Sequence, residues 1–477
     1  MFDVCVIGGG VIGGCILREL TKYKGSICLL EKSYDVATGQ SAANSGIVHA
    51  GFDALPNTNK AKFNVLGNKL MKKWASELGV EYINNGSIVL GFDEKDREML
   101  LHLLERGKQN GVTDLELVDR DKLLELEPNI SDNVECGLLA KTGGIICPYQ
   151  LTIASVGNAM DNGAQLYYDF EVSAITKNDN QFTIESTKGE QIQAKVIINC
   201  AGFNSAIISS LAGDNSYKVS GRKGEYILLD KESGDFAKHT LFTTPTEKGK
   251  GILVSPTVDG NILLGPTSVE VGRNGSVDTT TEGLKEVTEM ASKMCKNIPF
   301  YNTITSFTGV RAYSDKHDFI IEESKVVKGL INCIGIESPG LTSAPAIAEY
   351  VAHNLVKNII ELPTNDNFNG KRQSSKQFKS LTAEQKNQLI KQDDKYGKIV
   401  CRCEQVTEGE IVNAIHQNPP ARSLLAIKRR TRAGMGRCQS GFCQSTMVEI
   451  LARELNIPQE QVTLKGSGSE ILMGKIK

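Results

Sequence analysis

The sequence predicts an α/β protein that combines a βαβ-type domain, an antiparallel-sheet domain and a small helical domain. Residues 1–31 read as strand, glycine turn, helix and strand, and short alternating runs separated by turns occupy residues 217–319. Four cysteines follow a polar stretch, within residues 401–443. Interleaved strands and helices favour an α/β architecture, whereas alternating strands joined by turns predict an antiparallel sheet.

The expected elements follow hydrophobic periodicity along the chain. The first unit comprises a strand at Phe2–Ile7, a helix at Val11–Lys22 and a strand at Ser26–Leu30. Helical spacing then dominates residues 60–110, with a second helix at Asp93–Gly107. Further strands are expected at Gln165–Ile175, Phe182–Glu185, Val196–Ile198, Glu225–Leu229, Gly251–Ser255 and Asn261–Gly265.

These elements predict a division of the chain into two interleaved domains, a linker and a tail. The first domain takes residues 1–80, 145–215 and 320–362, and a substrate domain takes residues 81–144 and 216–319. A polar stretch rich in Asn, Gln, Ser and Lys predicts a linker at 363–395. The four cysteines lie in an expected domain at 396–458, before a tail at 459–477.

Composition narrows the class of protein. The chain has 477 residues, enough for about three domains. It has no apolar run near the roughly 18 residues that span a bilayer, and its strand at Phe2 leaves no room for a secretion signal. A net charge of −2 argues against nucleic-acid binding. Eight of the twelve cysteines lie in apolar segments, so we expect reduced core thiols and a cytoplasmic protein.

A dinucleotide site is predicted at the first turn. Gly8, Gly10 and Gly13 form GxGxxG directly between strand and helix. Such glycines allow the tight turn, the approach of backbone to a pyrophosphate and close helix packing, in a Rossmann-like arrangement. Glu31 ends the next strand, where a carboxylate can accept hydrogen bonds from a ribose. This fingerprint alone does not choose between FAD and NAD.

Three later segments favour FAD. Residues Thr38–Gly51, Ile197–Gly202 and Gly335–Pro345 resemble the flavin-binding segments of the D-amino-acid oxidase superfamily, and the resemblance covers about residues 1–360. No second GxGxxG follows, which disfavours a pyridine-nucleotide disulfide reductase. A helix near Thr342 can direct its positive end at a bound flavin. The resemblance implies FAD contacts from Gly8, Gly10, Val11, Ile12, Gly13, Glu31, Lys32, Thr38, Ser41, Asn44, Ser45, Gly46, Val172, Ala201, Gly202, Gly309, Gly340, Leu341 and Thr342.

The four remaining cysteines predict a metal site. Cys401, Cys403, Cys438 and Cys443 follow the pattern CxCx34CxxxxC, and a capping box is expected at Thr407. Structural zinc usually binds cysteine pairs with two to four residues between them, which CxC does not match, so zinc is the weaker alternative. The spacing and flanking residues resemble the bacterioferritin-associated-ferredoxin-like domain, which implies a [2Fe-2S] cluster. A basic run with nine Lys or Arg against three Glu between residues 395 and 437 can offset the cluster's charge, or form a solvated face or nucleic-acid patch.

Three residues are candidates for the reacting centre. Alcohol oxidation needs a base, and the resemblance places His49 against the flavin ring, although a structural histidine is the competing interpretation. Arg311 resembles the family arginine that binds an anionic substrate, against the alternative of a surface ion pair. Tyr226 is expected to line the pocket. We assign no function to the other five histidines.

The combined domains resemble the anaerobic-type glycerol-3-phosphate dehydrogenase catalytic subunits. This resemblance implies oxidation of sn-glycerol 3-phosphate to dihydroxyacetone phosphate, with electrons passing to a flavoprotein, ferredoxin or quinone pathway. The segment GIESPGLT at residues 335–342 instead resembles L-2-hydroxyglutarate oxidases, so a 2-hydroxy acid oxidoreductase is the near alternative. An amine oxidase is a more distant alternative. A non-catalytic electron-transfer or redox-sensing subunit is an alternative of another class. Peripheral membrane contact and homo-oligomer formation stay open.

Overall fold

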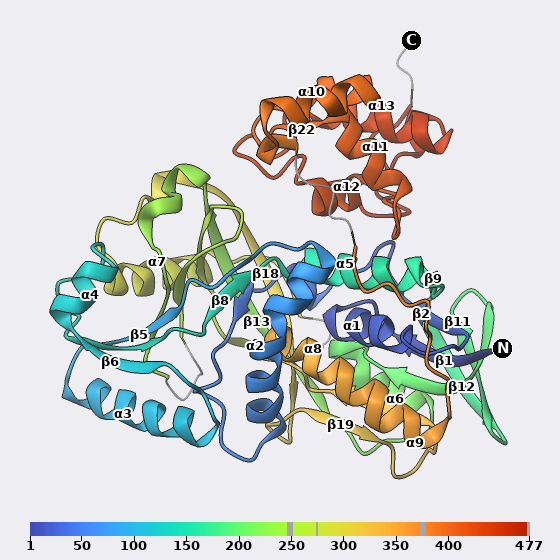
Figure 1. Cartoon of the computed structure of the whole chain (residues 1–477), viewed down its shortest axis with the longest axis horizontal. Helices are drawn as coiled ribbons and strands as arrows, with labels where there is room; N and C mark the ends of the chain where they lie inside the picture. The colour runs from blue at the N-terminus through green and yellow to red at the C-terminus, as the bar shows by residue number, and fades with distance from the viewer. Residues whose placement is uncertain (246–250, 273–274, 373–377, 475–477) are drawn as a thin grey trace.

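Two sheet-based units and a helical unit make up the chain. The computed structural model describes residues 1–245, 251–272, 275–372 and 378–474. Small parts of the predicted substrate domain (246–250 and 273–274), linker (373–377) and tail (475–477) therefore lie outside the described residues. Figure 1 shows the helical unit, in orange and red, above the two larger units.

A mainly parallel sheet forms the first unit. Five strands run parallel in the order β9 (Gln165–Tyr167), β2 (Ile27–Leu30), β1 (Phe2–Ile7), β12 (Gln191–Asn199) and β20 (Leu330–Ile334). The hairpin of β10 (Val172–Asn178) and β11 (Gln181–Ser186) pairs antiparallel with β12, and β19 (Ile320–Glu323) pairs antiparallel with β20. The expected run Gln165–Ile175 is thus two strands, because a turn separates β9 from β10.

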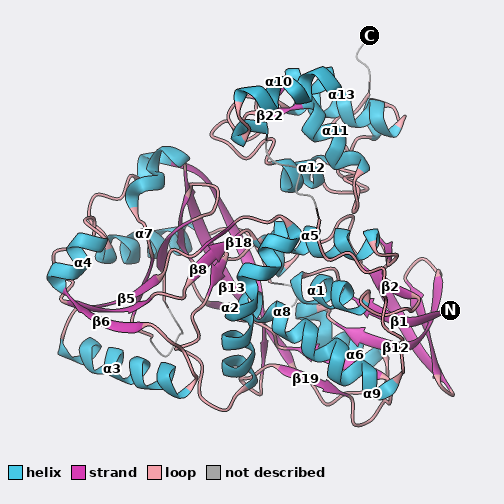
Figure 2. Cartoon of the chain, in the orientation of Figure 1, coloured by secondary structure: helices cyan, strands magenta, loops and turns pink. Residues whose placement is uncertain are grey.

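Helices cover both faces of this sheet. Val4 and Val6 face a core shared with α1 (Val11–Leu20), α5 (Pro148–Asp161) and α8 (Gly340–Tyr350). Cys5 and Ile7 face the opposite core, to which α6 (Ser205–Leu211) contributes, as the period of two along a strand requires. Helix α2 (Asn59–Leu78) lies against α8 (Figure 2). Within the described part of the chain, no helix combines the length and apolar character that a membrane-spanning segment needs.

The second unit is a nine-stranded sheet in which α7 (Thr281–Met294) and α3 (Glu94–Gln109) cover opposite faces. Its neighbours are antiparallel except for the parallel pair β5 and β14. The strand order is β17 (Val269–Val271), β13 (Val219–Leu229), β16 (Ile262–Gly265), β15 (Leu253–Pro256), β14 (Thr240–Thr243), β5 (Ser87–Gly91), β7 (Cys136–Ala140) and β6 (Leu115–Asp119), and β18 (Thr303–Ser314) pairs with β13. A small sheet of β3 (Ile47–Val48), β8 (Gly144–Ile146) and β4 (Tyr82–Ile83) lies beside α2.

The third unit packs three helices around its own core. Helices α11 (Glu408–His416), α12 (Leu424–Thr431) and α13 (Gln444–Leu455) bury Ile411, Ile427 and Leu451, next to the short pair β21 (Ile399–Cys401) and β22 (Val406–Thr407). The expected capping box is present, because Thr407 and Glu410 satisfy each other's backbone amides. Helix α10 (Ala383–Gln392) falls inside the range predicted as a linker.

Arginines of the basic run attach the helical unit to both larger units. Arg430 pairs with Asp35 of the first unit at 2.7 Å, and both side chains are only 1% exposed. Arg432 pairs with Asp259 at 2.5 Å and Arg437 with Glu232 at 2.5 Å, both in the second unit. At least part of the basic run therefore docks one unit on another, a role that its spacing alone did not indicate.

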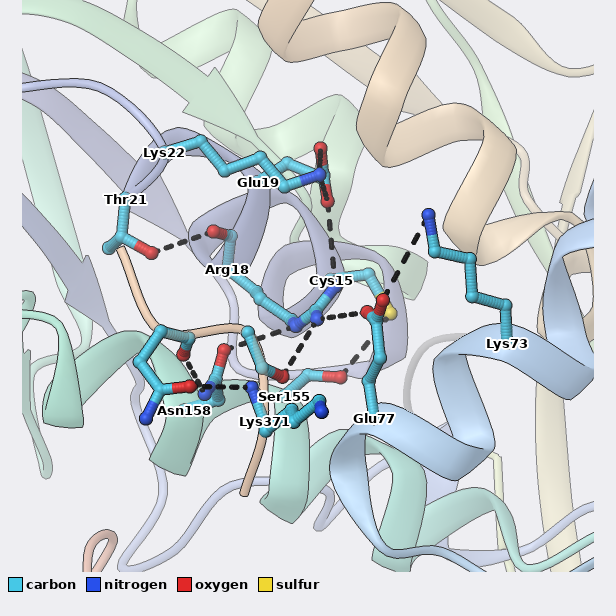
Figure 3. A network of polar contacts seen from close by, with 12 residues as sticks. Cys15, Arg18, Glu19, Thr21, Lys22, Lys73, Glu77, Ser155, Asn158 and Lys371 are labelled. Carbon is cyan, nitrogen blue, oxygen red and sulfur yellow. Dashed lines mark hydrogen bonds and ion pairs between the residues drawn. The ribbon is translucent and has the colours of Figure 1, made fainter. Parts of the chain in front are cut away.

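A buried polar network holds the helical layer of the first unit together (Figure 3). Arg18 of α1 donates to Glu77 of α2 at 2.6 Å, to Asn158 of α5 at 3.1 Å and to the carbonyl of Gly370 at 3.1 Å. Its guanidinium also lies 4.3 Å from the centroid of Trp74. A single side chain, 1% exposed, thus joins three helices and the segment that leads to the helical unit.

We expect Arg18→Ala to lower the free energy of unfolding by about 3–5 kcal/mol, the usual effect of removing one partner of a buried ion pair. Lys24→Ala is the matched control, since Lys24 and Asp366 form an exposed pair, with side chains 54% and 81% exposed. That control should change stability by less than about 1 kcal/mol. Urea unfolding checks both values, and equal effects would show that the buried network does not stabilise the fold.

Candidate functional site

One cavity of about 1140 Å³ runs between the first and second units. Small-molecule sites are typically about 300–1,000 Å³, so this volume suits an extended cofactor together with a small substrate. All predicted FAD-contacting residues line the cavity except Gly13 and Thr342, and His49, Tyr226 and Arg311 line it as well. The structure therefore brings segments separated by hundreds of residues to one site.

The glycine turn forms one wall of the cavity through close backbone contacts. Gly8 has φ +110°, and a Cβ placed there would lie 2.5 Å from the carbonyl oxygen of Cys200. A Cβ on Gly13 would lie 2.0 Å from the oxygen of Gly8, so Gly13 acts through packing rather than by facing the cavity. Helix α1 begins directly after Gly10, whose position offers no side-chain cap. The Val11 amide donates to the Ser41 hydroxyl at 2.9 Å, and Ile12 also lines the cavity, so a phosphate can bind at this end of the helix.

Glu31 connects this turn to the end of β2. Its carboxylate accepts from the backbone N–H of Gly9 at 2.7 Å and of Ser33 at 2.8 Å. Burial raises the pKa of Glu31, although these amide hydrogen bonds oppose the rise. A carboxylate has about four acceptor positions, so two amide contacts leave capacity for ribose hydroxyls at the cavity.

Residues without bulky side chains shape the middle of the cavity. A Cβ on Gly309 would lie 1.9 Å from the carbonyl oxygen of Ala43, so β18 and the segment around Ala43 touch backbone to backbone. Gly46 has φ +68°, and its Cβ would lie 2.6 Å from the oxygen of Ile146. Both positions accept only glycine without a local shift, and the Gly309 contact sets how closely the second unit approaches the first.

Helix α8 directs its N-terminal end at the cavity. Gly340 and Leu341 line the cavity, and Pro339 precedes them without a side-chain cap. The helix begins two residues before the expected Thr342, which is fully buried. The Thr342 hydroxyl accepts from the N–H of His49 at 2.9 Å and donates to the carbonyl of Ile47 at 3.3 Å. Thr342 thus positions the His49 segment instead of facing the cavity.

His49 is held on several sides. Its carbonyl accepts from Asn64 at 2.7 Å and from Asn68 at 3.1 Å. Its ring Nε2 lies 3.2 Å from the hydroxyl of Ser338, and the ring lies 6.0 Å from that of Phe242. These contacts fix the imidazole at the cavity beside a hydroxyl that can share its proton. Sequence reasoning missed Ser338, because nothing local in its segment signals that contact.

Two arginines from neighbouring strands line the same part of the cavity. Arg222 of β13 lies opposite Arg311 of β18 in the strand pairing. One Nη of Arg311 donates to the carbonyl of Thr267 at 2.9 Å, while its buried Nε has no hydrogen-bond partner among the described residues. Arg222 stacks at 4.4 Å over Tyr313. Arg222 was not among the predicted site residues, since its distance from Arg311 in sequence hides their pairing.

Tyr226 reaches the cavity from β13. Its side chain is buried and stacks on Phe307 with centroids 4.8 Å apart. Burial raises the pKa of the Tyr226 phenol, while Arg311 and Ser45 oppose the rise. His317, which received no assigned function, also lines the cavity, and its ring contacts the hydroxyl of Tyr313.

The four cysteines of the third unit meet as two pairs. The sulfurs of Cys403 and Cys438 lie 3.6 Å apart. Contact with Cys443 lowers the pKa of Cys401 to about 6, and the N–H of Gly434 also donates to the Cys401 sulfur at 3.5 Å. Two thiolates on one tetrahedral metal ion, each about 2.3 Å from it, lie roughly 3.7 Å apart.

This paired donor set fits a two-iron cluster. Each iron of a [2Fe-2S] cluster takes two cysteine thiolates. Among the described residues, no three His, Cys, Asp or Glu side chains are arranged around one point as a single metal ion would need. The other eight cysteines are buried free thiols, as expected for core positions.

Comparisons with known proteins agree with this geometry. The family model described as FAD dependent oxidoreductase matches residues 3–354, and the chain belongs to this family. A model of the BFD-like [2Fe-2S] binding domain matches residues 399–453. The chain is therefore an FAD-dependent oxidoreductase that also carries a [2Fe-2S] domain, and the fold class and both cofactors expected from the sequence are confirmed.

Several relatives have names that state a more specific activity than the family does. A glycerol 3-phosphate dehydrogenase of Caloramator mitchellensis is 46% identical over 100% of this chain and 99% of its own length. The solved structure of dithionite-reduced L-α-glycerophosphate oxidase from Mycoplasma pneumoniae with FAD bound has a TM-score of 0.74 and 30% identity, covering 78% of this chain and 98% of that one. A mitochondrial L-2-hydroxyglutarate dehydrogenase of Bos taurus is 30% identical over 56% of this chain and 61% of its own length.

We expect Gly13→Ala to lower FAD affinity roughly tenfold or more, since overpacking costs about 1–3 kcal/mol and here displaces the dinucleotide turn. Gly272→Ala is the control, because a Cβ there meets no described residue within 4 Å. The flavin absorbance per mole of purified protein measures the effect, and circular dichroism checks folding. Full flavin content in Gly13→Ala would contradict a binding role for this turn.

Proposed function

We propose that this protein oxidises sn-glycerol 3-phosphate to dihydroxyacetone phosphate and delivers the electrons through its [2Fe-2S] cluster to a partner acceptor. The observation that carries the proposal is the full-length similarity to a glycerol 3-phosphate dehydrogenase, which includes the segment with the four cysteines. The arrangement of His49, Arg222 and Arg311 around the cavity supports it independently.

FAD occupies the long cavity in this proposal and, when bound, supplies the two-electron acceptor. The amides that open α1 bind its pyrophosphate, and Glu31 accepts hydrogen bonds from its ribose. Gly340 and Leu341 place the positive end of α8 beside the flavin ring, where it favours added negative charge. Gly309 lets the second unit approach the Ala43 segment of the first unit backbone to backbone beside the ring.

Arg311 binds the substrate's phosphate. Its Nε has no hydrogen-bond partner within the described part of the chain, and its guanidinium is held by Thr267, so the side chain is positioned before substrate arrives. A planar guanidinium suits a phosphate or carboxylate. Arg222 adds a second positive charge from the neighbouring strand and is itself held over Tyr313. Two arginines match a phosphate that carries close to two negative charges.

His49 accepts the hydroxyl proton of the substrate. Loss of hydride from a carbon that bears a hydroxyl requires a base within hydrogen-bond reach of that hydroxyl. The backbone of His49 is fixed by Asn64, Asn68 and Thr342, so its ring keeps one position at the cavity. The Ser338 hydroxyl, 3.2 Å from Nε2, orients the ring through a hydrogen bond.

Cys401, Cys403, Cys438 and Cys443 hold the cluster, which supplies one-electron transfer when bound. Cys403 is exposed, and Phe442, next to Cys443, is 87% exposed. An acceptor can therefore approach this side of the domain, and we propose a flavoprotein, a ferredoxin or a quinone pathway. The other eight cysteines are buried free thiols, which suits a reducing compartment, and we propose a cytoplasmic location.

L-2-Hydroxyglutarate is the second candidate substrate. The similarity to a mitochondrial L-2-hydroxyglutarate dehydrogenase favours it, although over a smaller part of the chain. The chemistry is close, because that compound also has a secondary hydroxyl and anionic groups that arginine binds. A non-catalytic relay would contain both cofactors but would receive electrons only from another protein.

Titration of the purified protein without oxygen separates these functions. We expect sn-glycerol 3-phosphate to bleach the flavin absorbance within one catalytic turnover, whereas L-2-hydroxyglutarate at the same concentration should leave it largely unchanged. Preferential bleaching by L-2-hydroxyglutarate would reassign the substrate. Failure of both compounds in a protein that contains FAD would favour the relay.

We expect Arg311→Ala to raise KM for glycerol 3-phosphate by roughly 10–150-fold, since a hydrogen bond to a charged group contributes about 1.5–3 kcal/mol. FAD content should not change, because Arg311 contacts the substrate rather than the cofactor in this assignment. Arg120→Ala is the control, because Arg120 pairs with Asp132 and does not line the cavity. Steady-state kinetics with an artificial acceptor provide the measurement, and an unchanged KM would remove Arg311 from the substrate site.

A further inference from the structure

The four-cysteine unit reaches into the cavity that holds FAD in the proposal above. Leu425 and Arg429 of α12, and Lys465 of the loop that follows α13, line this cavity. They share it with Glu31, Lys32 and Tyr34, the residues at the end of β2. A domain expected only to carry the cluster thus contributes three side chains to the other cofactor's site.

Tyr34 of the first unit is the residue that the four-cysteine unit contacts here. Arg429 donates to the Tyr34 hydroxyl at 3.3 Å, and its guanidinium lies 6.0 Å from the centroid of the ring. The Cα of Gly466 comes so close that a Cβ there would lie 2.8 Å from Cβ of Tyr34. The loop is anchored in turn, because the amide of Leu425 donates to the carbonyl of Leu464 at 3.0 Å.

Arg430 and Asp35, the residues that follow Arg429 and Tyr34, form an ion pair that stabilises the contact. Arg430 donates to the two carboxylate oxygens of Asp35 at 2.7 and 2.8 Å, and its Nε donates to the carbonyl of Pro419 at 2.9 Å. Asp35 also accepts from the Tyr168 hydroxyl at 3.3 Å. A two-point arginine pair fixes orientation as well as distance. The position of Arg429 at the cavity therefore follows from the docking of the whole unit.

This end of the cavity is the one that receives the adenosine half of a dinucleotide. The acid at the end of the second strand, here Glu31, marks the ribose position. Arg429 bonds Tyr34, three residues after Glu31, and Lys465 precedes Gly466, which also lies against Tyr34, so both side chains line the cavity near this end. A guanidinium stacks on flat aromatic rings, and an ammonium group attracts phosphate oxygens.

We propose that the four-cysteine unit covers the adenosine end of the FAD site, so that FAD binding and docking of this unit stabilise each other. The proposal rests on FAD occupying the cavity, as proposed above. Linkage is reciprocal: if the docked unit increases FAD affinity by some factor, FAD favours docking by the same factor. The flavin and the cluster are then retained together, and a protein without FAD holds its cluster unit less firmly.

FAD affinity of the full chain with its cluster tests the proposal. After FAD is removed, fluorescence titration should show that Arg429→Ala/Lys465→Ala raises Kd for FAD about tenfold or more, through loss of stacking and charge. Arg422→Ala is the matched control, because this exposed arginine of the same unit does not line the cavity. The visible absorbance of the cluster checks that each variant has folded.

Hydrogen exchange of the wild-type protein supplies a second readout that needs no variant. Adding FAD should slow exchange at residues 424–432 as well as at residues 31–35. Protection of residues 31–35 alone, or equal FAD affinity in the double variant and the control, would overturn the proposal. A wild-type protein that binds no FAD would instead overturn the proposed function, so the two failures are distinguishable.

Discussion

The close approach of backbone to backbone at the first glycine turn is the constraint on which the rest of the structure depends. Gly13 lets α1 touch the carbonyl of Gly8, and Gly8 lets the turn touch Cys200 at the end of β12. Glu31 then binds the amide of Gly9, so three parallel strands end at one place. The cavity begins there because no side chain fills the space that these contacts leave.

Close backbone contact also shapes the rest of the cavity, and charged side chains add its polar groups. Gly309 brings β18 of the second unit against the Ala43 segment of the first, while His49, Arg222 and Arg311 place charged or ionisable groups at the cavity. His49, Arg222 and Arg311 are each held by a hydrogen bond or a ring contact, so the functional side chains are positioned before substrate binds. Such preorganisation favours catalysis by reducing the rearrangement that the reaction requires.

Local sequence patterns predicted the helices and strands of this protein better than they predicted which elements pair or pack together. The strands β1, β2, β12, β13 and β16, the helices α1, α2 and α3 and the capping box at Thr407 follow from periodicity and end signals, with shifts of a few residues at their ends. The parallel pair of β5 and β14 does not, because two strands about 150 residues apart in sequence carry no local sign of pairing. Ser338 and Arg222 escaped notice for the same reason: each gains its place through a contact with a distant residue.

The sequence by itself determined the class of the protein. A glycine turn between strand and helix, three flavin-type segments and four spaced cysteines are local features whose chemistry depends on residue type and spacing. Only the tertiary structure decided which residues the arginines of the basic run contact. Arg430, Arg432 and Arg437 pair with Asp35, Asp259 and Glu232, and Arg429 reaches the cavity. The physical reason is that a charge in sequence has no partner until folding brings an opposite charge within a few ångströms of it.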